Sequence, residues 1–304
     1  MTPFRVSILG CGSALPTLRH CASSQVVELR DKKFMVDCGE GTQMQLRRAR
    51  IGFNSIRAVF ISHIHGDHCF GLIGMISTFG LQGRTAPLQI YAPKELGEVL
   101  DTQLRLFCAH LDYEVTFHAV DPSAQNVVYE DNSLQVETIP LQHRMPCCGY
   151  IFREKPTLPH IRRDMIDYLK IPVSQISNIK SGADWVREDG TVVPNKRLVS
   201  PADRPRAYAY CSDTRYVPTL HERMEGIDTL YHESTYGDDD AQLAEKFCHS
   251  TARQAALVAR AAGVRRLLLG HYSSRYDDES ILLRQAREVF PESYLTNEKD
   301  IFDI

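Results

Sequence analysis

The chain has 304 residues, of which 43% are hydrophobic and 24% charged, as in ordinary globular proteins, so wholesale disorder is excluded. There are 35 Lys and Arg residues against 38 Asp and Glu, and this net charge of -3 at first argues against a nucleic-acid binder. No apolar run approaches the ~20 residues of a membrane span. The nine scattered cysteines indicate reduced thiols in a cytoplasmic protein.

Hydrophobic periodicity predicts strands and helices along most of the chain. We expect strands at 4–9, 25–29, 34–36 and 58–62, and a basic helix that ends near 52. Helices near 70–80 and 94–109 are followed by short strands through 115–153. In the last third we expect strands near 207–211, 228–232 and 265–270 and helices near 215–224, 250–262 and 278–289. Metal-type residues follow several of these strands, which points to a layered α/β fold. The whole chain, 1–304, is expected to form one catalytic domain.

The strongest chemical signal lies at residues 63–68, which read His-Ile-His-Gly-Asp-His directly after an apolar strand. In an extended segment His63 and His65 point to the same side, so both can reach one cation. Asp67 and His68 offer an oxygen and a nitrogen to a second cation nearby. Imidazole and carboxylate suit zinc or another first-row ion, and four potential ligands in six positions make a merely solvated loop improbable.

This motif is similar to the HxHxDH signature of the metallo-β-lactamase superfamily, whose fold is a four-layer αββα sandwich. Later ligands of that superfamily have matches after predicted strands, at His143, Asp213 and His271. The resemblance implies two Zn²⁺ ions, with Mn²⁺ or Mg²⁺ as possible substitutes. The first would be held by His63, His65 and His143 and the second by Asp67, His68 and His271, with Asp213 bridging them.

Within the superfamily the chain resembles the tRNase Z (ribonuclease Z) family in its short form. Residues 37–43 resemble the family's DxGEGTQ segment, 232–235 its HEAT motif and 249–251 its HST loop. The resemblance implies an endoribonuclease that removes the 3′ trailer of precursor tRNA, leaving a 3′-hydroxyl on the tRNA and a 5′-phosphate on the trailer. It also implies a homodimer. Asp67 is expected to be the general base, and His249, held by Glu233, the proton donor.

Between 154 and 206 periodicity weakens, prolines recur and basic residues accumulate, so we expect an inserted basic arm that binds tRNA. Residues 144–206 hold 12 basic and 7 acidic side chains, a net +5, which leaves −8 for the rest of a chain of net charge -3. Phosphates attract such a segment. The expected RNA contacts are Arg162, Arg163, Lys170 and Lys180 in the arm, and Arg19 and His20 in a loop that the family uses at the tRNA 3′ end.

Two alternatives remain open at this point. A small-molecule hydrolase of the same fold, such as a lactonase, arylsulfatase or phosphodiesterase, would share every metal ligand. The arm and the pair formed by Glu233 and His249 argue against it. A non-catalytic RNA-binding scaffold would be expected to have lost metal ligands, whereas this chain has the full set.

Overall fold

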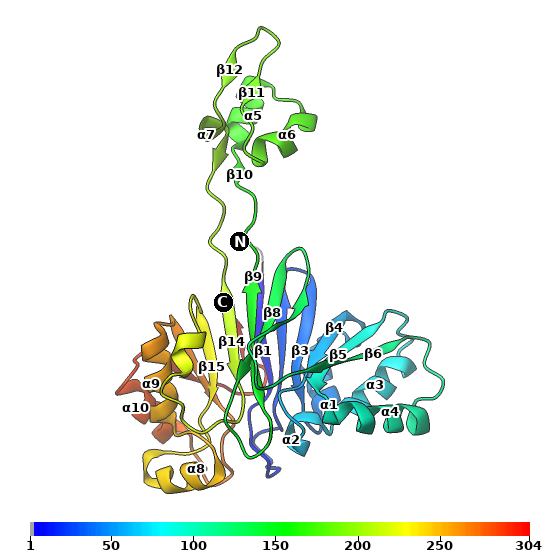
Figure 1. Cartoon of the computed structure of the whole chain (residues 1–304), viewed down its shortest axis with the longest axis vertical. Coiled ribbons are helices and arrows are strands. Elements are labelled where there is room, and N and C mark those ends of the chain that lie inside the picture. Colours follow the sequence, from blue (N-terminus) through cyan, green and yellow to red (C-terminus); the bar gives the residue numbers. More distant parts are fainter. Residues whose placement is uncertain (1–2) are drawn as a thin grey trace. The chain divides into compact units, whose positions relative to one another are not determined.

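The computed structural model describes residues 3–304, which divide into two compact units (Figure 1). The larger unit contains residues 3–130, 135–153 and 206–304, and the smaller one contains Asp131–Leu134 and Glu154–Pro205. Among these described residues, every helix is too short or too polar to cross a membrane.

Two seven-stranded sheets form the middle of the larger unit. The first runs in the order β18 (Ile301–Asp303), β1 (Phe4–Gly10), β2 (Ser24–Leu29), β3 (Lys32–Cys38), β4 (Ile56–Phe60), β5 (Leu88–Pro93) and β6 (Val115–Val120). The second runs in the order β17 (Ser293–Leu295), β16 (Arg266–Gly270), β15 (Thr229–Glu233), β14 (Ala207–Cys211), β9 (Cys148–Glu154), β8 (Leu134–Pro140) and β7 (Val127–Glu130). Strands β3 to β6 are mutually parallel, and so are β14 to β17.

Alternation along the strands explains the layers, because successive side chains face opposite sides of a sheet. On β4, Phe60 packs on Phe152 and Tyr150 of the second sheet, with ring centroids 5.5 and 5.2 Å apart. Its neighbours Val59 and Ile61 face the other way, into a cluster shared with the flanking helices. That layer comprises α1 (Thr42–Arg48), α2 (Gly66–Cys69), α3 (Leu72–Leu81) and α4 (Glu95–Phe107).

Figure 1 shows α9 (Ala252–Ala262) and α10 (Ser280–Arg287) on the outer side of the second sheet, with α8 (Ala241–Phe247) near its end. Helix α9 begins at a capping box, in which the Thr251 hydroxyl accepts from the Gln254 amide and the Gln254 side chain accepts from the Thr251 amide. Helices therefore cover both sheets, and the expected four-layer αββα sandwich is confirmed.

The smaller unit has its own secondary structure. It contains α5 (Arg163–Leu169), α6 (Val173–Lys180) and α7 (Asn195–Leu198), and two ladders that pair β10 (His160–Ile161) with β13 (Val199–Ser200) and β11 (Trp185–Val186) with β12 (Val192–Val193). Ile171, Ile179, Val193 and Leu198 form its small core. We refer to this unit as the arm.

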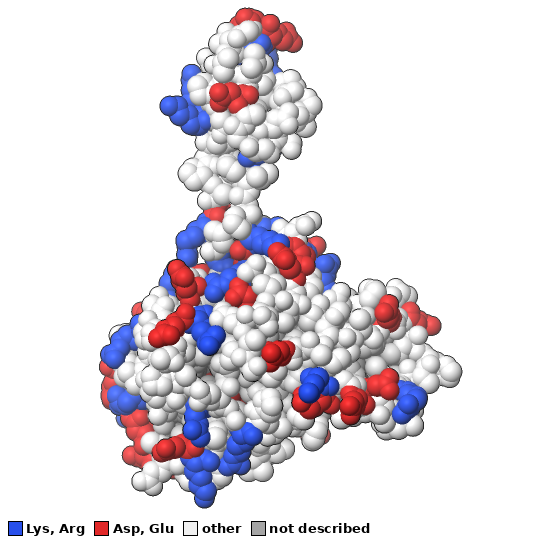
Figure 2. All heavy atoms as spheres, in the orientation of Figure 1, with Lys and Arg blue, Asp and Glu red and all other residues white. Residues whose placement is uncertain are grey.

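The charge of the arm is smaller than the sequence segment suggested. Residues 154–205 carry nine basic and seven acidic side chains. The three further arginines of the 144–206 interval, Arg144, Arg153 and Arg206, belong to the larger unit. In Figure 2 Lys and Arg are interspersed with Asp and Glu over the visible face of each unit.

One expected helix is replaced by other structure. Residues 215–224 contain only the short 3₁₀ turn η2 (Leu220–Arg223), because Pro218 has no amide to donate and keeps the preceding residue extended. The remaining 3₁₀ turns are η1 (Phe53–Ser55) and η3 (Asp238–Asp240), the second of which leads into α8, a helix that the periodicity did not reveal.

Candidate metal centre

The site forms where strands of both sheets end. His63 follows β4, His143 follows β8, Asp213 follows β14 and His271 follows β16. The register pairs Cys211 with His232 and Glu233 with Gly270, so the carboxyl ends of these parallel strands lie at one edge. Ligands commonly bind at such an edge of an α/β fold. The sequence motifs therefore converge because strand ends converge.

Asp213 lies between two groups of side chains. Its Oδ2 is 3.7 Å from Nε2 of both His63 and His143, and His63 Nε2 is 3.0 Å from His65 Nδ1. Its Oδ1 is 3.1 Å from His271 Nε2 and 3.4 Å from His68 Nε2. Asp67 Oδ2 completes the second group, 3.3 Å from His68 Nε2 and 3.4 Å from His271 Nε2.

These separations are those of metal ligands. Nitrogen and oxygen ligands about 2.0–2.1 Å from a tetrahedral zinc ion lie about 3.3 Å from one another. His68 Nε2 and Asp213 Oδ1 are buried and make no hydrogen bond to any described residue. Leaving such atoms unsatisfied costs about 1–3 kcal/mol each. A cation in each group would satisfy both atoms, so the residues present fit a metal pair.

The outer ring nitrogens of the histidines are held by the protein. His63 Nδ1 contacts the Ser62 hydroxyl at 3.0 Å, and His68 Nδ1 contacts Asp37 Oδ2 at 2.7 Å. His143 Nδ1 lies 2.9 Å from the Cys248 carbonyl, and His271 Nδ1 lies 2.9 Å from the Thr235 hydroxyl. Such partners fix the ring orientation of metal-binding histidines and direct the free lone pair inward.

Burial lowers the pKa of His63, His65 and His143, so these imidazoles are neutral and ready to bind a cation. Burial would also lower the pKa of His68, but the surrounding carboxylates raise it well above its usual value. Burial favours the protonated form of Asp213, yet the neighbouring histidines lower its pKa far below the usual range. The carboxylates of the second group, which contains Asp67, His68, Asp213 and His271, therefore favour a positive charge among them.

Asp37 anchors this arrangement from beneath. It is fully buried at the end of β3 with a left-handed φ of 55°, and it accepts four hydrogen bonds. The donors are the Ser62 amide at 2.8 Å, the Ser62 hydroxyl at 2.9 Å, the Tyr210 hydroxyl at 2.6 Å and His68 Nδ1 at 2.7 Å. Asp37 opens the segment that resembles DxGEGTQ, whereas nothing in the sequence pointed to Ser62 or Tyr210, since hydroxyls at these places follow no recognisable spacing.

Glu233 and His249 meet beside the centre. Glu233 Oε1 is 2.8 Å from His249 Nδ1, and Glu233 Oε2 accepts from the Thr235 hydroxyl at 2.6 Å. Burial disfavours the His249 cation, but the Glu233 carboxylate outweighs burial and raises the pKa of His249 to about 9. Thr235 links the pair to His271, a connection that sequence reasoning missed.

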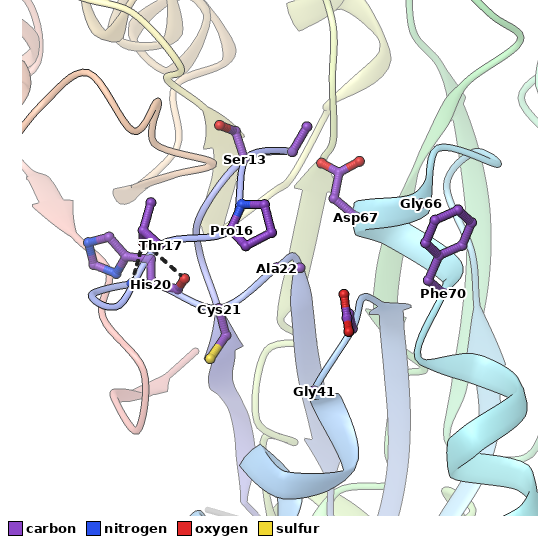
Figure 3. Close-up of a pocket in the computed structure, with 12 residues that line it drawn as sticks. Ser13, Pro16, Thr17, His20, Cys21, Ala22, Gly41, Gly66, Asp67 and Phe70 are labelled. Atoms are coloured by element: carbon purple, nitrogen blue, oxygen red, sulfur yellow. Dashed lines mark hydrogen bonds between the residues drawn. The ribbon is translucent and has the colours of Figure 1, made fainter.

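Two cavities open beside Asp67. One, of about 460 Å³, is lined by His65, His143, His249 and the exposed Arg144. The other, of about 490 Å³, lies between Asp67 and the loop of residues 13–21 (Figure 3). A water or a substrate group can thus reach Asp67 from two sides.

The expected RNA contacts belong to both units. Arg162, Arg163 and Lys170 are exposed on the arm, and Lys180 is half-buried there. Arg19 is held within the larger unit, where its guanidinium forms an ion pair with Glu279 at 2.8 Å and donates to the carbonyls of Tyr276 and Asp277. His20 lies against Glu298, with Nδ1 to Oε2 at 3.1 Å.

We expect Asp37→Asn to weaken metal binding about 10- to 100-fold, because the amide cannot give His68 the same charged acceptor. Chelator competition during metal titration measures the change. Tyr210→Phe is the matched control, since it removes one donor and keeps the contact between the carboxylate and His68. Equal losses in the two variants would contradict the role given to Asp37.

Comparison with known proteins places this geometry in a family. Residues 4–159 match the family model described as Anti-Pycsar protein Apyc1. A ribonuclease Z from Bacteroides fragilis (strain YCH46) is 55% identical over 298 residues, which cover 98% of each chain.

Two solved structures share the fold. Human tRNase Z, short form, superposes with a TM-score of 0.71 at 23% identity over 99% of both chains. The metallo-β-lactamase fold protein YhfI from Bacillus subtilis superposes with a TM-score of 0.71 at 18% identity over 100% of both chains. The chain therefore belongs to the ribonuclease Z family, on the metallo-β-lactamase fold, and its residues 4–159 belong also to the sequence family that the Apyc1 model describes.

Proposed function

We propose that the chain is a cytoplasmic endoribonuclease that cleaves the 3′ trailer from precursor tRNA. The products are a 3′-hydroxyl on the tRNA and a 5′-phosphate on the trailer. One observation carries the proposal: the two ligand groups that share Asp213 occur in a chain 55% identical to a ribonuclease Z along almost its whole length.

The proposed cofactor is a pair of Zn²⁺ ions, for which Mn²⁺ or Mg²⁺ can substitute. His63, His65 and His143 would hold one ion, Asp67, His68 and His271 the other, with Asp213 shared by both. Such a pair supplies Lewis acidity to a phosphodiester and lowers the pKa of an attacking water. Five neutral imidazoles and two carboxylates leave the pair with net positive charge, which favours an anionic substrate.

Asp67 is the proposed general base. Its carboxylate lines both cavities and lies within 3.4 Å of His68 and His271, so it is held in place and remains reachable. Neighbouring histidines overcome burial and lower the pKa of Asp67, which keeps it ionised. An ionised carboxylate at this position can accept the proton of the attacking water.

His249 is the proposed proton donor to the leaving oxygen. Its side chain lines the same cavity as His143, and the Glu233 carboxylate stabilises its cation at 2.8 Å. A histidine that retains its proton near neutral pH can deliver it to the departing 3′ oxygen. Glu233 accepts hydrogen bonds from His249 and Thr235, two residues that line this cavity, so it acts as a positioning residue.

The function is tested by incubating the purified chain with a precursor tRNA and Zn²⁺ or Mn²⁺ and mapping both product ends. We expect one cut at the acceptor end that yields the ends given above. Asp67→Ala should abolish the cut and leave tRNA binding nearly unchanged. An unprocessed precursor would overturn the function, and full activity of Asp67→Ala would overturn the base assignment.

His249→Ala is expected to slow cleavage about 10²- to 10⁴-fold, the usual contribution of a general acid. A substrate with sulfur in place of the leaving 3′ oxygen separates the roles, because a thiolate leaves without a proton. The loss should largely disappear with this substrate. Glu233→Gln is the comparison variant, and its loss should not add to that of His249→Ala. An equal loss on both substrates would contradict the assignment.

We propose that the arm binds tRNA away from the reacting phosphate. The support is chemical, because Arg162, Arg163 and Lys170 are exposed on a unit that has its own apolar core. Of these three side chains, Arg162 is paired with Asp164 at 2.7 Å. A compact insertion of this length in a catalytic domain is usually functional. Cationic side chains on it would engage the phosphate backbone with strong salt dependence.

Removal of the arm is expected to spare a small phosphodiester, such as a nitrophenyl ester, and to cripple tRNA cleavage. The register pairs Arg153 with Ala207, so residues 156–203 can be replaced by a short Gly-Ser turn. Alanine at Arg163 and Lys170, with the arm retained, should weaken tRNA binding and reduce its salt dependence. Equal loss of both activities on deletion would contradict the proposal.

We also infer a homodimer. The exposed side chains of Phe70 and Val99 border a cavity of about 480 Å³ between α2 and α4, and apolar surface of this kind marks interaction sites. Symmetric dimers are the commonest assembly. Sedimentation should give twice the 34.5 kDa chain mass, and Val99→Glu should give monomer. A monomeric wild type would refute the dimer.

A further inference from the structure

A second cluster of metal-ligating side chains lies outside the centre described above. Cys11 follows β1, His20 belongs to the loop of residues 13–21 and Glu298 precedes β18. Cys11 Sγ is 3.2 Å from His20 Nδ1 and 3.7 Å from Glu298 Oε1. His20 Nδ1 is 3.1 Å from Glu298 Oε2. The two ends of one N-terminal loop and a segment near the C-terminus therefore bring one sulfur, one nitrogen and one oxygen together.

The spacing of these atoms is close to that of a tetrahedral zinc site. Sulfur, nitrogen and oxygen ligands lie about 2.0–2.3 Å from zinc, which places them about 3.4–3.6 Å from one another, within about 0.4 Å of each separation given above. The cluster is also largely buried, since Cys11 is 0% exposed and the side chains of His20 and Glu298 are 8% and 14% exposed.

The partners around the cluster orient its atoms as partners of metal ligands do. His20 Nε2, the ring nitrogen that faces away from Cys11, lies 3.4 Å from Glu279 Oε1. Glu298 Oε1 accepts from the Cys21 amide at 2.7 Å, which leaves Oε2 for the cluster. A carboxylate behind a ligating imidazole fixes the ring and increases its basicity.

The donor set selects the kind of ion. Burial, with the nearby Glu298 charge, raises the pKa of the Cys11 thiol well above its usual value, so the thiol needs a bound cation to ionise. Thiolate and imidazole prefer zinc to Mg²⁺ or Mn²⁺. We propose that Cys11, His20 and Glu298 bind one zinc ion, separate from the metal pair, with a fourth position left to water from the cavity that His20 lines.

The ion would fasten the loop of residues 13–21 to the C-terminal segment. This loop forms the wall that faces Asp67 across the cavity in Figure 3. The loop is otherwise attached through the ion pair of Arg19 with Glu279, the hydrogen bonds of Arg19 to the Tyr276 and Asp277 carbonyls, and the hydrogen bond from the Ser13 amide to the Tyr272 carbonyl. Zinc here is structural: it holds one wall of the substrate cavity and takes no part in the reaction.

Cobalt substitution tests the site, because Cys11 is the only thiol in the four metal-ligand groups of the described residues. The Co²⁺-loaded wild type should show a near-ultraviolet thiolate-to-cobalt band and bind one ion more per chain than Cys11→Ser. Cys21→Ser, which changes the thiol within residues 13–21, should keep both the band and the additional ion. Wild type without the band, or a band that survives in Cys11→Ser, overturns the proposal.

Glu298→Gln guards against a folding defect in Cys11→Ser, since Glu298 is partly exposed and glutamine can still accept from the Cys21 amide. Circular dichroism should be native, while the affinity for the additional ion should fall at least tenfold. Amide hydrogen exchange in residues 13–21 should rise on loss of that ion. Unchanged affinity in Glu298→Gln counts against the site.

Discussion

The carboxylate of Asp213 is the constraint on which the rest of the site depends. It is 2% exposed, and each of its oxygens faces a different group of imidazoles. A buried charge is tolerated only when it is paired and hydrogen-bonded, so the surrounding strands must deliver several partners to one point. The parallel arrangement of β14, β15 and β16 does this, because it gathers the strand ends from which Asp213, Glu233 and His271 project.

The backbone at this edge is strained in a consistent way. Asp37, Cys248 and His271 have positive φ values of 55°, 59° and 60°, in the left-handed region that side chains usually avoid. Each such residue costs about 1–3 kcal/mol and persists only where the surroundings enforce it. Here each one aims a group at the centre: Asp37 holds His68, the Cys248 carbonyl holds His143, and His271 faces Asp213 directly. The centre therefore depends on the stability of the two sheets behind it.

The sandwich could be predicted because its strands are long enough to show alternation and its chemical residues follow them directly. The roles of Thr235 and of the Cys248 carbonyl could not be predicted, since a hydroxyl or a main-chain oxygen becomes the partner of a histidine only through the three-dimensional path of the chain. The helices and strands inside the arm, whose presence was expected, escaped prediction for another reason. Its ladders have two residues per strand and its helices four to eight residues, too short for any period to appear, although Ile171 and Leu198 still form a core.

The net charge of the chain is a poor guide to RNA binding, because the charged side chains that it sums lie in different parts of the molecule. The buried carboxylates Asp37 and Asp213 and the half-buried Asp67 are matched within the centre and present little negative charge to a ligand. The arm is only slightly basic, since it holds nine cations and seven anions in residues 154–205. Arg144 is the basic residue of the interval that lines the cavity beside His143, with its guanidinium 4.7 Å from the Phe247 ring centroid. Under the proposed function, the metal pair and Arg144 would therefore attract the reacting phosphate, while a few exposed cations on the arm, rather than its small net charge, would contact the tRNA.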